Sequence, residues 1–341
     1  MQPMFNTSKQ VRGFHDEKVA IVGGERTNMR TRRNSNRTRL KAGLIRDGKP
    51  KPLGSHTQGS YAMHTMVQDD NLDYDIDDGL YFKAADLVGA QGGAMSALEV
   101  RKMVCAAVQD DKFKTPPDVR TNCVRVYYDA GYHVDIPTYR RLETTNIWTN
   151  KIEYSYELAG ASWRKSDAKK VTTWFNETNK DLSPEAVGEG QFRRVVRYLK
   201  MFSKSRPSWK GKNPSGFALT KLASECFVGR LNRDDDALRS TMKSIADRLV
   251  YNKSVQHPVV DEELISDGDP RPTYFMDRLN ENLGHLDVLD EVDCTHEKAM
   301  KAWDKVFCTS WFSEQPPEDG DDDGEPKSPV NKSGGGTYAS S

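Results

Sequence analysis

Carboxylates alternate with apolar residues in the segment DYDIDDGLY, which sets several acidic side chains close together. The alternation has the period of two that a β-strand requires, and its acidic positions are Asp73, Asp75 and Asp77. One face of such a strand is apolar, whereas the other is a row of like charges that repel one another. Residues two apart on a strand lie about 6–7 Å from each other, which suits two carboxylates sharing one hard cation. The pattern therefore predicts a divalent-cation site, with water or basic side chains as the alternative partners.

A second strand is predicted in GYHVDIPTY, where Asp135 stands between a valine and an isoleucine. A carboxylate in such a place is not expected to be buried without a partner. If this strand is a neighbour of the first, Asp135 joins Asp75 and Asp77 on one polar face. Three carboxylates with open coordination positions suit Mg²⁺, and two such ions can serve an in-line phosphoryl displacement. An exposed acidic hairpin without a ligand is the alternative.

A Gly-Ser turn, Gln58-Gly59-Ser60, precedes the acidic strand, and we expect a short helix over residues 61–67 after it. Such a turn offers backbone N–H groups and a hydroxyl group to phosphate oxygens. Alone the turn is unspecific. Its position shortly before an Asp-x-Asp strand predicts a nucleotide phosphate as its ligand.

The elements that must position these residues form a mixed α/β front half and a helical back half. In the front half we expect helices over residues 15–46 and 94–110, and a hairpin of strands 123–128 and 132–136 that turns at residues 129–131. In the back half we expect helices over residues 191–205, 215–228, 235–251 and 295–312. The first of these carries its apolar residues on one face, namely Phe192, Val195, Val196, Leu199 and Phe202. This spacing predicts a buried face.

Length and composition predict two lobes and a polar tail. A chain of 341 residues can bury a core in each of two lobes. We assign residues 1–160, with an N-terminal helix, to the first lobe and residues 161–312 to the second. Residues 313–341 are rich in Pro, Gly, Ser and Asp and are expected to be disordered. No apolar run approaches the roughly 20 residues of a membrane helix, and the N-terminus lacks the apolar region of a signal peptide. We therefore expect a cytoplasmic protein that does not contact membranes.

Basic residues and cysteines restrict the other ligands. Basic residues gather between positions 26 and 51, which is typical of a nucleic-acid contact or of one solvated helix face, and we favour the solvated face. The 5 cysteines are scattered and never spaced as C-x-x-C, which argues against a disulfide framework and against a thiolate zinc site.

Several motifs occur in a fixed order between residues 58 and 217: QGSYAMHT, DYDIDDGLY, CVRVYY, HVDIPTY, WRKSDAKKVTTWF, RRVVRYLK and NPSGF. This order resembles that of the cGAS/DncV-like nucleotidyltransferases (CD-NTases) of bacterial CBASS anti-phage systems, within the polymerase-β-type superfamily. A weaker resemblance extends to about residue 312. The resemblance implies an α/β (α+β) fold of two lobes, a mixed sheet with the catalytic carboxylates and a helical C-terminal lobe.

The resemblance also implies a metal site. Asp75 and Asp77 would bind two Mg²⁺ ions, for which Mn²⁺ could substitute, and Asp135 would hold the ion that activates the acceptor hydroxyl. Asp73 shares their predicted face, so the pair Asp73 and Asp75 stays open as an alternative. We prefer Asp77 because the segment DIDDG resembles the form found in the subfamily.

Nucleotide-binding positions follow from the same resemblance, and they are Gln58, Gly59, Ser60, Arg125, Ser166, Lys200 and Ser215. Lys200 and Ser215 would hold the donor triphosphate, whereas Arg125 and Ser166 would lie on the acceptor side. From the residues alone, Lys200 belongs to a polar helix stripe that could be solvated, and Ser215 stands where a helix N-cap belongs.

The implied activity is template-independent synthesis of a cyclic di- or trinucleotide second messenger from ATP, with GTP open as a second substrate. The resemblance adds an anti-phage role, an effector that senses the product, and no need for nucleic acid. It also adds an E1/E2-like partner at the C-terminus, although GGGTYASS fits an ordinary flexible end, which we favour. Two other functions stay open, namely nucleotide transfer to RNA or a small molecule, and non-catalytic binding of nucleotides or RNA.

Overall fold

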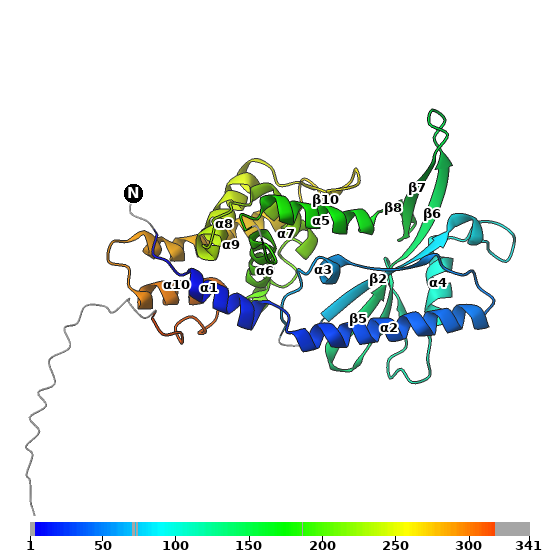
Figure 1. Cartoon of the computed structure of the whole chain (residues 1–341), viewed down its shortest axis with the longest axis horizontal. Helices are drawn as coiled ribbons and strands as arrows, with labels where there is room; N and C mark the ends of the chain where they lie inside the picture. Colours follow the sequence, from blue (N-terminus) through cyan, green and yellow to red (C-terminus); the bar gives the residue numbers. More distant parts are fainter. Residues whose placement is uncertain (1–3, 70–71, 73, 186, 318–341) are drawn as a thin grey trace, which may run out of the picture.

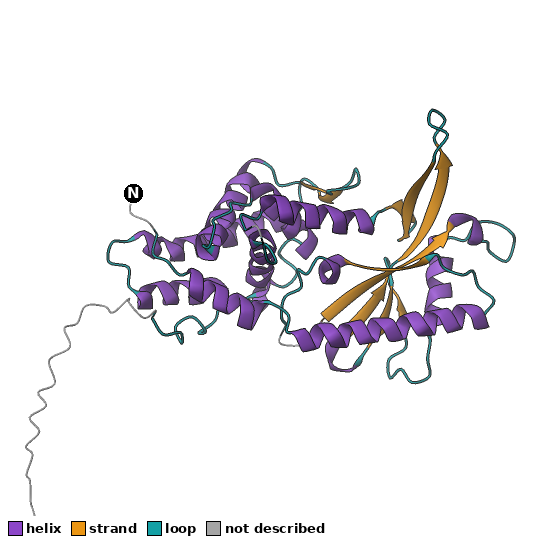
Figure 2. Cartoon of the chain, in the orientation of Figure 1, coloured by secondary structure: helices purple, strands orange, loops and turns teal. Residues whose placement is uncertain are grey.

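Two lobes make up the chain in the computed structural model, which describes residues 4–69, 72, 74–185 and 187–317. Figure 1 shows a twisted sheet with the long helix α2 (Gly23–Arg46) along it, and a separate group of helices. Strands dominate one end of the molecule and helices the other, as Figure 2 shows. This arrangement confirms the predicted two-lobed α/β fold. Residues 318–341 of the predicted disordered tail lie outside the described residues.

The sheet is built around β2 (Tyr74–Lys83), which is the predicted acidic strand. Two consecutive strands, β5 (Tyr132–Ile136) and β6 (Thr138–Thr145), run parallel to β2 in one unbroken register. They are separated only by Pro137, which has no N–H to give to a ladder. Its carbonyl oxygen still accepts from the Leu80 N–H at 2.8 Å. The two strands therefore act as one line of neighbours for β2.

The remaining strands extend this centre on both sides. They are β1 (Gly54–Gln58), β3 (Asp118–Val119), β4 (Val124–Tyr127), β7 (Ile152–Ala159) and β8 (Trp163–Lys165). β1 pairs with β2, and the order along the rest of the sheet is β3-β4-β5-β2-β6-β7-β8. The predicted hairpin is confirmed as β4 and β5, joined by a 3₁₀ turn, η3 (Asp129–Gly131). The sequence did not predict β1, β3, β6, β7 or β8.

Helices α2 and α4 (Ala97–Val108) cover one face of the sheet. The apolar residues of β2 and β5 that face them, among them Ile76 and Val134, are almost fully buried. α4 confirms the helix predicted over residues 94–110, and it begins at a capping box in which Ser96 and Glu99 satisfy each other's backbone N–H. The opposite face of β2 is left to the acidic side chains.

Close packing of α2 on α4 depends on Gly43. A Cβ atom at this position would overlap the backbone carbonyl group of Ala107. We expect Gly43→Ala to lower the free energy of unfolding by at least about 3 kcal/mol, at the upper end for an overpacked core. Gly24→Ala in the same helix is the control, because nothing lies near its Cβ and the gain in helix propensity is about 0.5–1 kcal/mol. Urea unfolding of both variants checks the difference, and equal stability would show that the helices can separate freely.

The N-terminal helix differs from the prediction over residues 15–46. The chain forms α1 (Ser8–Phe14) and a π-helical turn, η1 (His15–Val19), and only then α2. The break falls where Ala20 forms a bridge with Val67, just before two glycines of low helix propensity. α1 precedes the predicted helix and falls within residues 1–160, which we assign to the first lobe, but its Val11 and Phe14 are buried in the core of the helical lobe.

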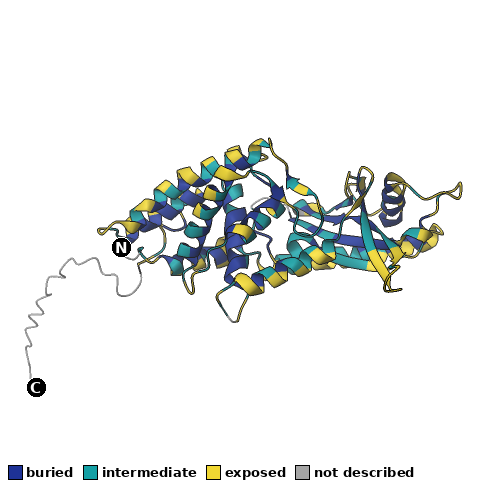
Figure 3. Cartoon of the chain, turned by 90° about the horizontal axis from the view of Figure 1, so that it is seen from above, coloured by how far each residue is buried: buried dark blue, intermediate teal, exposed yellow. Residues whose placement is uncertain are grey.

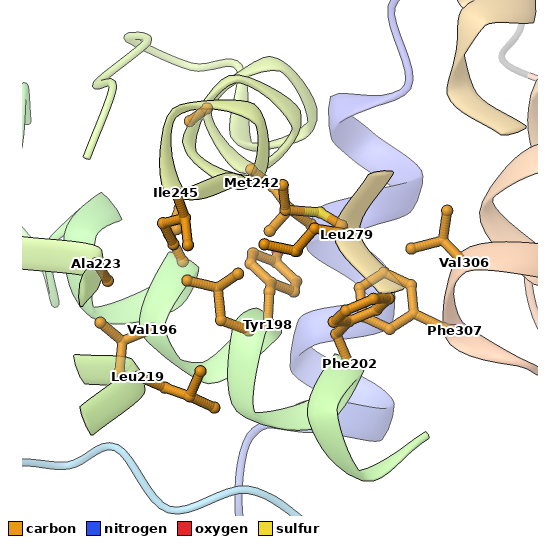
Figure 4. Packing of buried hydrophobic residues seen from close by; sticks show 14 of the residues in the cluster. Val196, Tyr198, Phe202, Leu219, Ala223, Met242, Ile245, Leu279, Val306 and Phe307 are labelled. Atoms are coloured by element: carbon orange, nitrogen blue, oxygen red, sulfur yellow. The ribbon is translucent and has the colours of Figure 1, made fainter. Parts of the chain in front are cut away.

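The helical lobe surrounds α6 (Gln191–Lys204). The other long helices are α5 (Ala168–Leu182), α7 (Gly216–Cys226), α8 (Asp234–Tyr251), α9 (Pro270–His285) and α10 (His296–Phe307). The shorter elements are η2 (Ala84–Asp86), η4 (Pro207–Trp209), η5 (Leu286–Asp290) and the strand pair β9 (Val255–Gln256) and β10 (Glu263–Ile265). Val196 and Phe202 of α6 meet Leu219, Ile245 and Phe307 from three other helices, as Figure 4 shows. The five apolar residues predicted to share a face of α6 are all fully buried, and Figure 3 shows the buried positions running through both lobes.

Several arginines of α2 have partners inside the protein. Arg37 forms an ion pair with Asp78, and Arg39 forms one with Asp110 at 2.7 Å. Arg33 donates to the Thr57 hydroxyl group at 2.8 Å. These arginines of the basic segment therefore hold α2 to neighbouring parts of the protein, including β1 and β2. Neither a nucleic-acid contact nor a solvated helix face, the two roles predicted for the segment, describes them. Of the helices in the described part of the chain, none combines the length and hydropathy that a membrane span requires.

Candidate active site

The register between β2 and β5 gathers the predicted carboxylates on one face of the sheet. Asp77 is paired with Asp135, and Asp75 with His133, across these neighbouring parallel strands. Because alternate residues of a strand share a face, Asp75, Asp77 and Asp135 project from the face that α2 and α4 leave open. The structure therefore brings together the three carboxylates that the sequence predicted as a group. Asp73, the alternative ligand, lies outside the described residues.

Asp78, the fourth acidic residue of this segment, serves the opposite face. Its carboxylate accepts two hydrogen bonds from the Arg37 guanidinium, at 2.5 and 2.7 Å, and is 3% exposed. A buried carboxylate with a bidentate arginine is satisfied without a metal. Asp78 therefore holds α2 to the sheet and is separate from the acidic site.

The three carboxylates of the open face differ in how their charge is balanced. Arg125 of β4 binds both oxygens of Asp135, at 2.7 and 2.8 Å, and its guanidinium also lies 3.5 Å from Asp75. His133 Nδ1 lies 3.2 Å from the same Asp75 carboxylate. Burial first, and then the charges of Asp135 and Asp75, raise the pKa of Asp77 to about 7. Further positive charge beside Asp77 would therefore favour its ionised form.

These carboxylates fit a divalent cation by type but do not form a closed cage. In the described part of the chain, no three His, Cys, Asp or Glu side chains are arranged to hold one metal ion. The Arg125 guanidinium lies among these side chains and donates to both oxygens of Asp135. Oxygen donors of this kind are those that Mg²⁺ prefers, and a guanidinium among them marks a place where positive charge is favoured. A cation held by Asp77 and Asp135 would compete with Arg125.

The predicted Gly-Ser turn packs directly on the central carboxylate. Gly59 begins α3 (Gly59–Ala62) with a φ of +65°, which glycine adopts without strain. A side chain at this position would overlap the Asp77 carboxylate. The helix predicted over residues 61–67 is wrong beyond residue 62, because His64 takes a left-handed conformation with a φ of +56°.

Gln58 and Ser166 meet at a tyrosine that the sequence analysis missed. The Gln58 amide donates to the Tyr139 hydroxyl group at 2.8 Å, and the Ser166 side chain also interacts with Tyr139. Gln58 Oε1 is buried and has no hydrogen-bond partner among the described residues. Tyr139 continues the alternation of β5 beyond Pro137, and this continuity was the signal that could have identified it.

Lys200 and Ser215 lie together at the entrance to α7. The Lys200 ammonium group donates to the Thr65 carbonyl oxygen at 3.1 Å and to the Thr65 hydroxyl group at 2.8 Å. Burial, and then the charges of Lys204 and Arg197, lower its pKa to about 7. Ser215 caps α7 by accepting from the backbone at 3.2 Å, and its neighbour Gly216 lies against the Lys200 side chain. The polar stripe that includes Lys200 therefore faces the first lobe instead of the solvent.

Known proteins are similar in sequence to parts of this chain. Residues 55–139 match the family described as "Cyclic GMP-AMP synthase DncV-like, nucleotidyltransferase domain". A cyclic GMP-AMP synthase of Escherichia coli is 26% identical over 153 residues, which cover 44% of this chain. The match spans 32% of that relative, so it includes about a third of the relative's length.

Solved structures with the same fold cover nearly all of this chain. Apo DncV of Vibrio cholerae is 15% identical, with a TM-score of 0.69 over 89% of this chain and 95% of that one. Escherichia coli DncV bound to 3′-deoxy GTP is 16% identical, with a TM-score of 0.64 over 85% and 92%. At this level of identity the likeness shows the fold alone. The domain match over residues 55–139, together with the carboxylates aligned on β2 and β5, identifies a DncV-like nucleotidyltransferase domain in a chain that has the fold of the DncV structures.

Proposed function

We propose that the protein is a cyclic oligonucleotide synthase, which joins nucleoside triphosphates into a cyclic di- or trinucleotide and releases pyrophosphate. The observation that carries this proposal is the sheet face on which Asp75, Asp77 and Asp135 lie together, with the Gly59 turn packed against Asp77. Carboxylates for cations beside a turn for phosphates are the parts that phosphoryl transfer requires, since its catalysis is mostly positioning and charge stabilisation.

In the proposed reaction, the 3′-hydroxyl group of an acceptor nucleotide attacks the α-phosphate of a donor. Asp75, Asp77 and Asp135 would hold two Mg²⁺ ions, which neutralise the phosphates and acidify the attacking hydroxyl group. The Gly59-Ser60 turn and the Lys200 ammonium group orient the donor triphosphate. Arg125 donates to Asp135, and its guanidinium can leave this carboxylate and bind an acceptor phosphate instead. A second transfer within the linear product closes the ring.

ATP is the proposed donor, and GTP is a second candidate substrate. Vibrio cholerae DncV, a cyclic AMP-GMP synthase, has been solved in complex with the linear intermediate 5′-pppA(3′,5′)pG. That structure is 16% identical to this chain, with a TM-score of 0.67 over 90% of this chain and 96% of that one. The buried Gln58 Oε1 supports a polar contact to a nucleotide in this chain as well.

The biological role is proposed on the family resemblance. A cyclic nucleotide made in the cytoplasm would activate an effector during phage infection. Conjugation of the C-terminus by an E1/E2-like partner would add a layer of control, and the Gly-rich end of the sequence is compatible with it. Co-expression with such a partner, followed by intact-mass analysis, tests this part separately.

Transfer to RNA is the main alternative, and a product assay separates the two. Purified protein is incubated with Mg²⁺ and all four radiolabelled nucleoside triphosphates, and the products are treated with phosphatase and identified by mass spectrometry. A phosphatase-resistant product would establish cyclisation and name its bases. Extension of a labelled RNA without such a product would support the RNA alternative. No product with either Mg²⁺ or Mn²⁺, from protein that still binds ATP, would contradict the proposed synthase activity under these conditions.

A further inference from the structure

The polar stripe of α6 holds the chain segment that directly follows the Gly59-Ser60 turn. Its side chains donate to three consecutive backbone carbonyl oxygens: Arg193 to Met63 at 3.1 Å, Arg197 to His64 at 2.8 Å, and Lys200 to Thr65 at 3.1 Å. The carbonyl groups belong to the connection between α3 and β2, whose Met63 is buried in the core of the helical lobe. One helix of the second lobe therefore fixes, residue by residue, the backbone that leads from the Gly59-Ser60 turn.

Arg197 is the buried arginine of this stripe. Its side chain is buried, at 8% exposure, and its Nη1 lies 2.6 Å from a Glu189 carboxylate oxygen and 2.9 Å from His15 Nε2. A guanidinium bound on both sides loses little freedom when it donates to a carbonyl group. Arg197 therefore holds the His64 carbonyl group in one position.

The held segment needs such support because of its own conformation. His64 has a φ of +56°, a region that costs a residue with a side chain about 1–3 kcal/mol and persists only where its surroundings enforce it. Within the turn, the Thr65 N–H donates to the Ser60 carbonyl oxygen at 2.9 Å, and the Met63 N–H donates to the Gly59 carbonyl oxygen at 3.1 Å. A displacement of the carbonyl groups of Met63 and His64 would therefore also move Gly59 and Ser60.

We propose that Arg197, assisted by Arg193, is a positioning residue for the donor nucleotide. It does not touch the nucleotide. Through the His64 carbonyl group it keeps the Gly59-Ser60 turn seated against Asp77, so that the helical lobe sets the place of the phosphates in the other lobe. The inference rests on the proposed function only in naming the nucleotide as the ligand of the turn.

The test compares two arginines that donate to backbone carbonyl groups in different places. Arg197→Met is combined with Glu189→Gln, so that no unpaired carboxylate is left behind, and Arg197→Lys is the conservative variant. Arg206→Met is the control, because Arg206 donates at 3.1 Å to the carbonyl oxygen of Val306 inside the helical lobe. Hydrogen exchange of residues 60–65 is measured without ligand, and the Kd for ATP with Mg²⁺ is measured by calorimetry.

We expect the double variant to raise the Kd by about tenfold or more, because a displaced Gly59-Ser60 turn no longer meets the phosphates in the bound geometry. Amides 60–65 should exchange faster by at least about tenfold. Arg197→Lys should lie between the wild type and the double variant, and Arg206→Met should change neither quantity. If the double variant does not fold, Arg193→Met replaces it, with the same expected direction.

Unchanged exchange at residues 60–65, or an unchanged Kd, would overturn the positioning role. Equal effects of Arg206→Met would overturn it as well, because they would show a general loss of stability. A wild-type protein that binds no ATP would overturn the proposed function, and the exchange rates alone would then confirm or reject the anchoring of the turn.

Discussion

Replacing Asp75 and Asp77 together by asparagine should abolish nucleotide transfer and leave the protein folded. Both carboxylates lie on the open face of β2, and asparagine keeps their size while removing the charges that a divalent cation needs. Charge stabilisation by bound cations supplies several kcal/mol in such reactions, and each 1.4 kcal/mol corresponds to a factor of ten. We therefore expect product formation to fall by at least about a thousandfold in the phosphatase-resistant assay.

Asp78→Asn is the matched control, since it removes one negative charge from the same strand on the opposite face. It weakens the ion pair with Arg37, so we expect a lower unfolding temperature with activity close to that of the wild type. For Asp77→Asn we expect the reverse, namely a loss of activity and, when unfolding is measured in EDTA, no loss of stability. Burial and neighbouring carboxylates raise the pKa of Asp77 to about 7, so the charged form costs stability increasingly between its unfolded pKa of 3.8 and that value. At pH 8 the asparagine variant should thus be no less stable than the wild type. Equal inactivity of Asp78→Asn would refute the assignment of the two faces.

Alternation made the acidic site predictable from the sequence. A period of two in DYDIDDGLY and GYHVDIPTY indicated both strands and the faces of Asp75, Asp77 and Asp135, because the pleat of a strand leaves no other arrangement. That the two strands are neighbours was an assumption, and the register confirms it and shows in addition that they run parallel. The role of Asp78 was not predictable, since its partner Arg37 lies 41 residues away on a helix.

The missed elements share a physical reason, which is that their neighbours and not their own residues define them. β1 reads GSHTQ and has no apolar alternation, yet it completes one edge of β2. β6 begins after a proline and carries charged residues along its length, so its pattern resembles that of a loop. Lys200 on α6 looked solvated for the same reason, because only the packing of the two lobes turns its stripe toward Thr65.

Binding of ATP with Mg²⁺ at pH 8 should be accompanied by uptake of close to one proton, and Lys200 should be the group that takes it up. In the free protein, burial and the nearby cations lower the pKa of Lys200 to about 7, so the amine is mostly neutral at pH 8. A triphosphate beside it favours the charged form and raises the pKa again. Affinity should therefore fall between pH 7 and pH 9, by at most about tenfold for each pH unit in the window between the two pKa values.

Calorimetry in Tris and in HEPES at pH 8 measures this uptake directly, because the observed heat then depends on the ionisation enthalpy of the buffer. Lys200→Met should abolish the difference between the buffers and raise the Kd, since it removes the ammonium group that takes up the proton and meets the triphosphate. Lys204→Met is the control, because Lys204 lies one turn further along α6 and approaches Asp69 at 3.4 Å. It should keep the proton uptake. Equal uptake by Lys200→Met would place the proton on another group and would separate Lys200 from the triphosphate. A pH-independent Kd in the wild type would show instead that the ammonium group stays bound to Thr65 when the nucleotide is present.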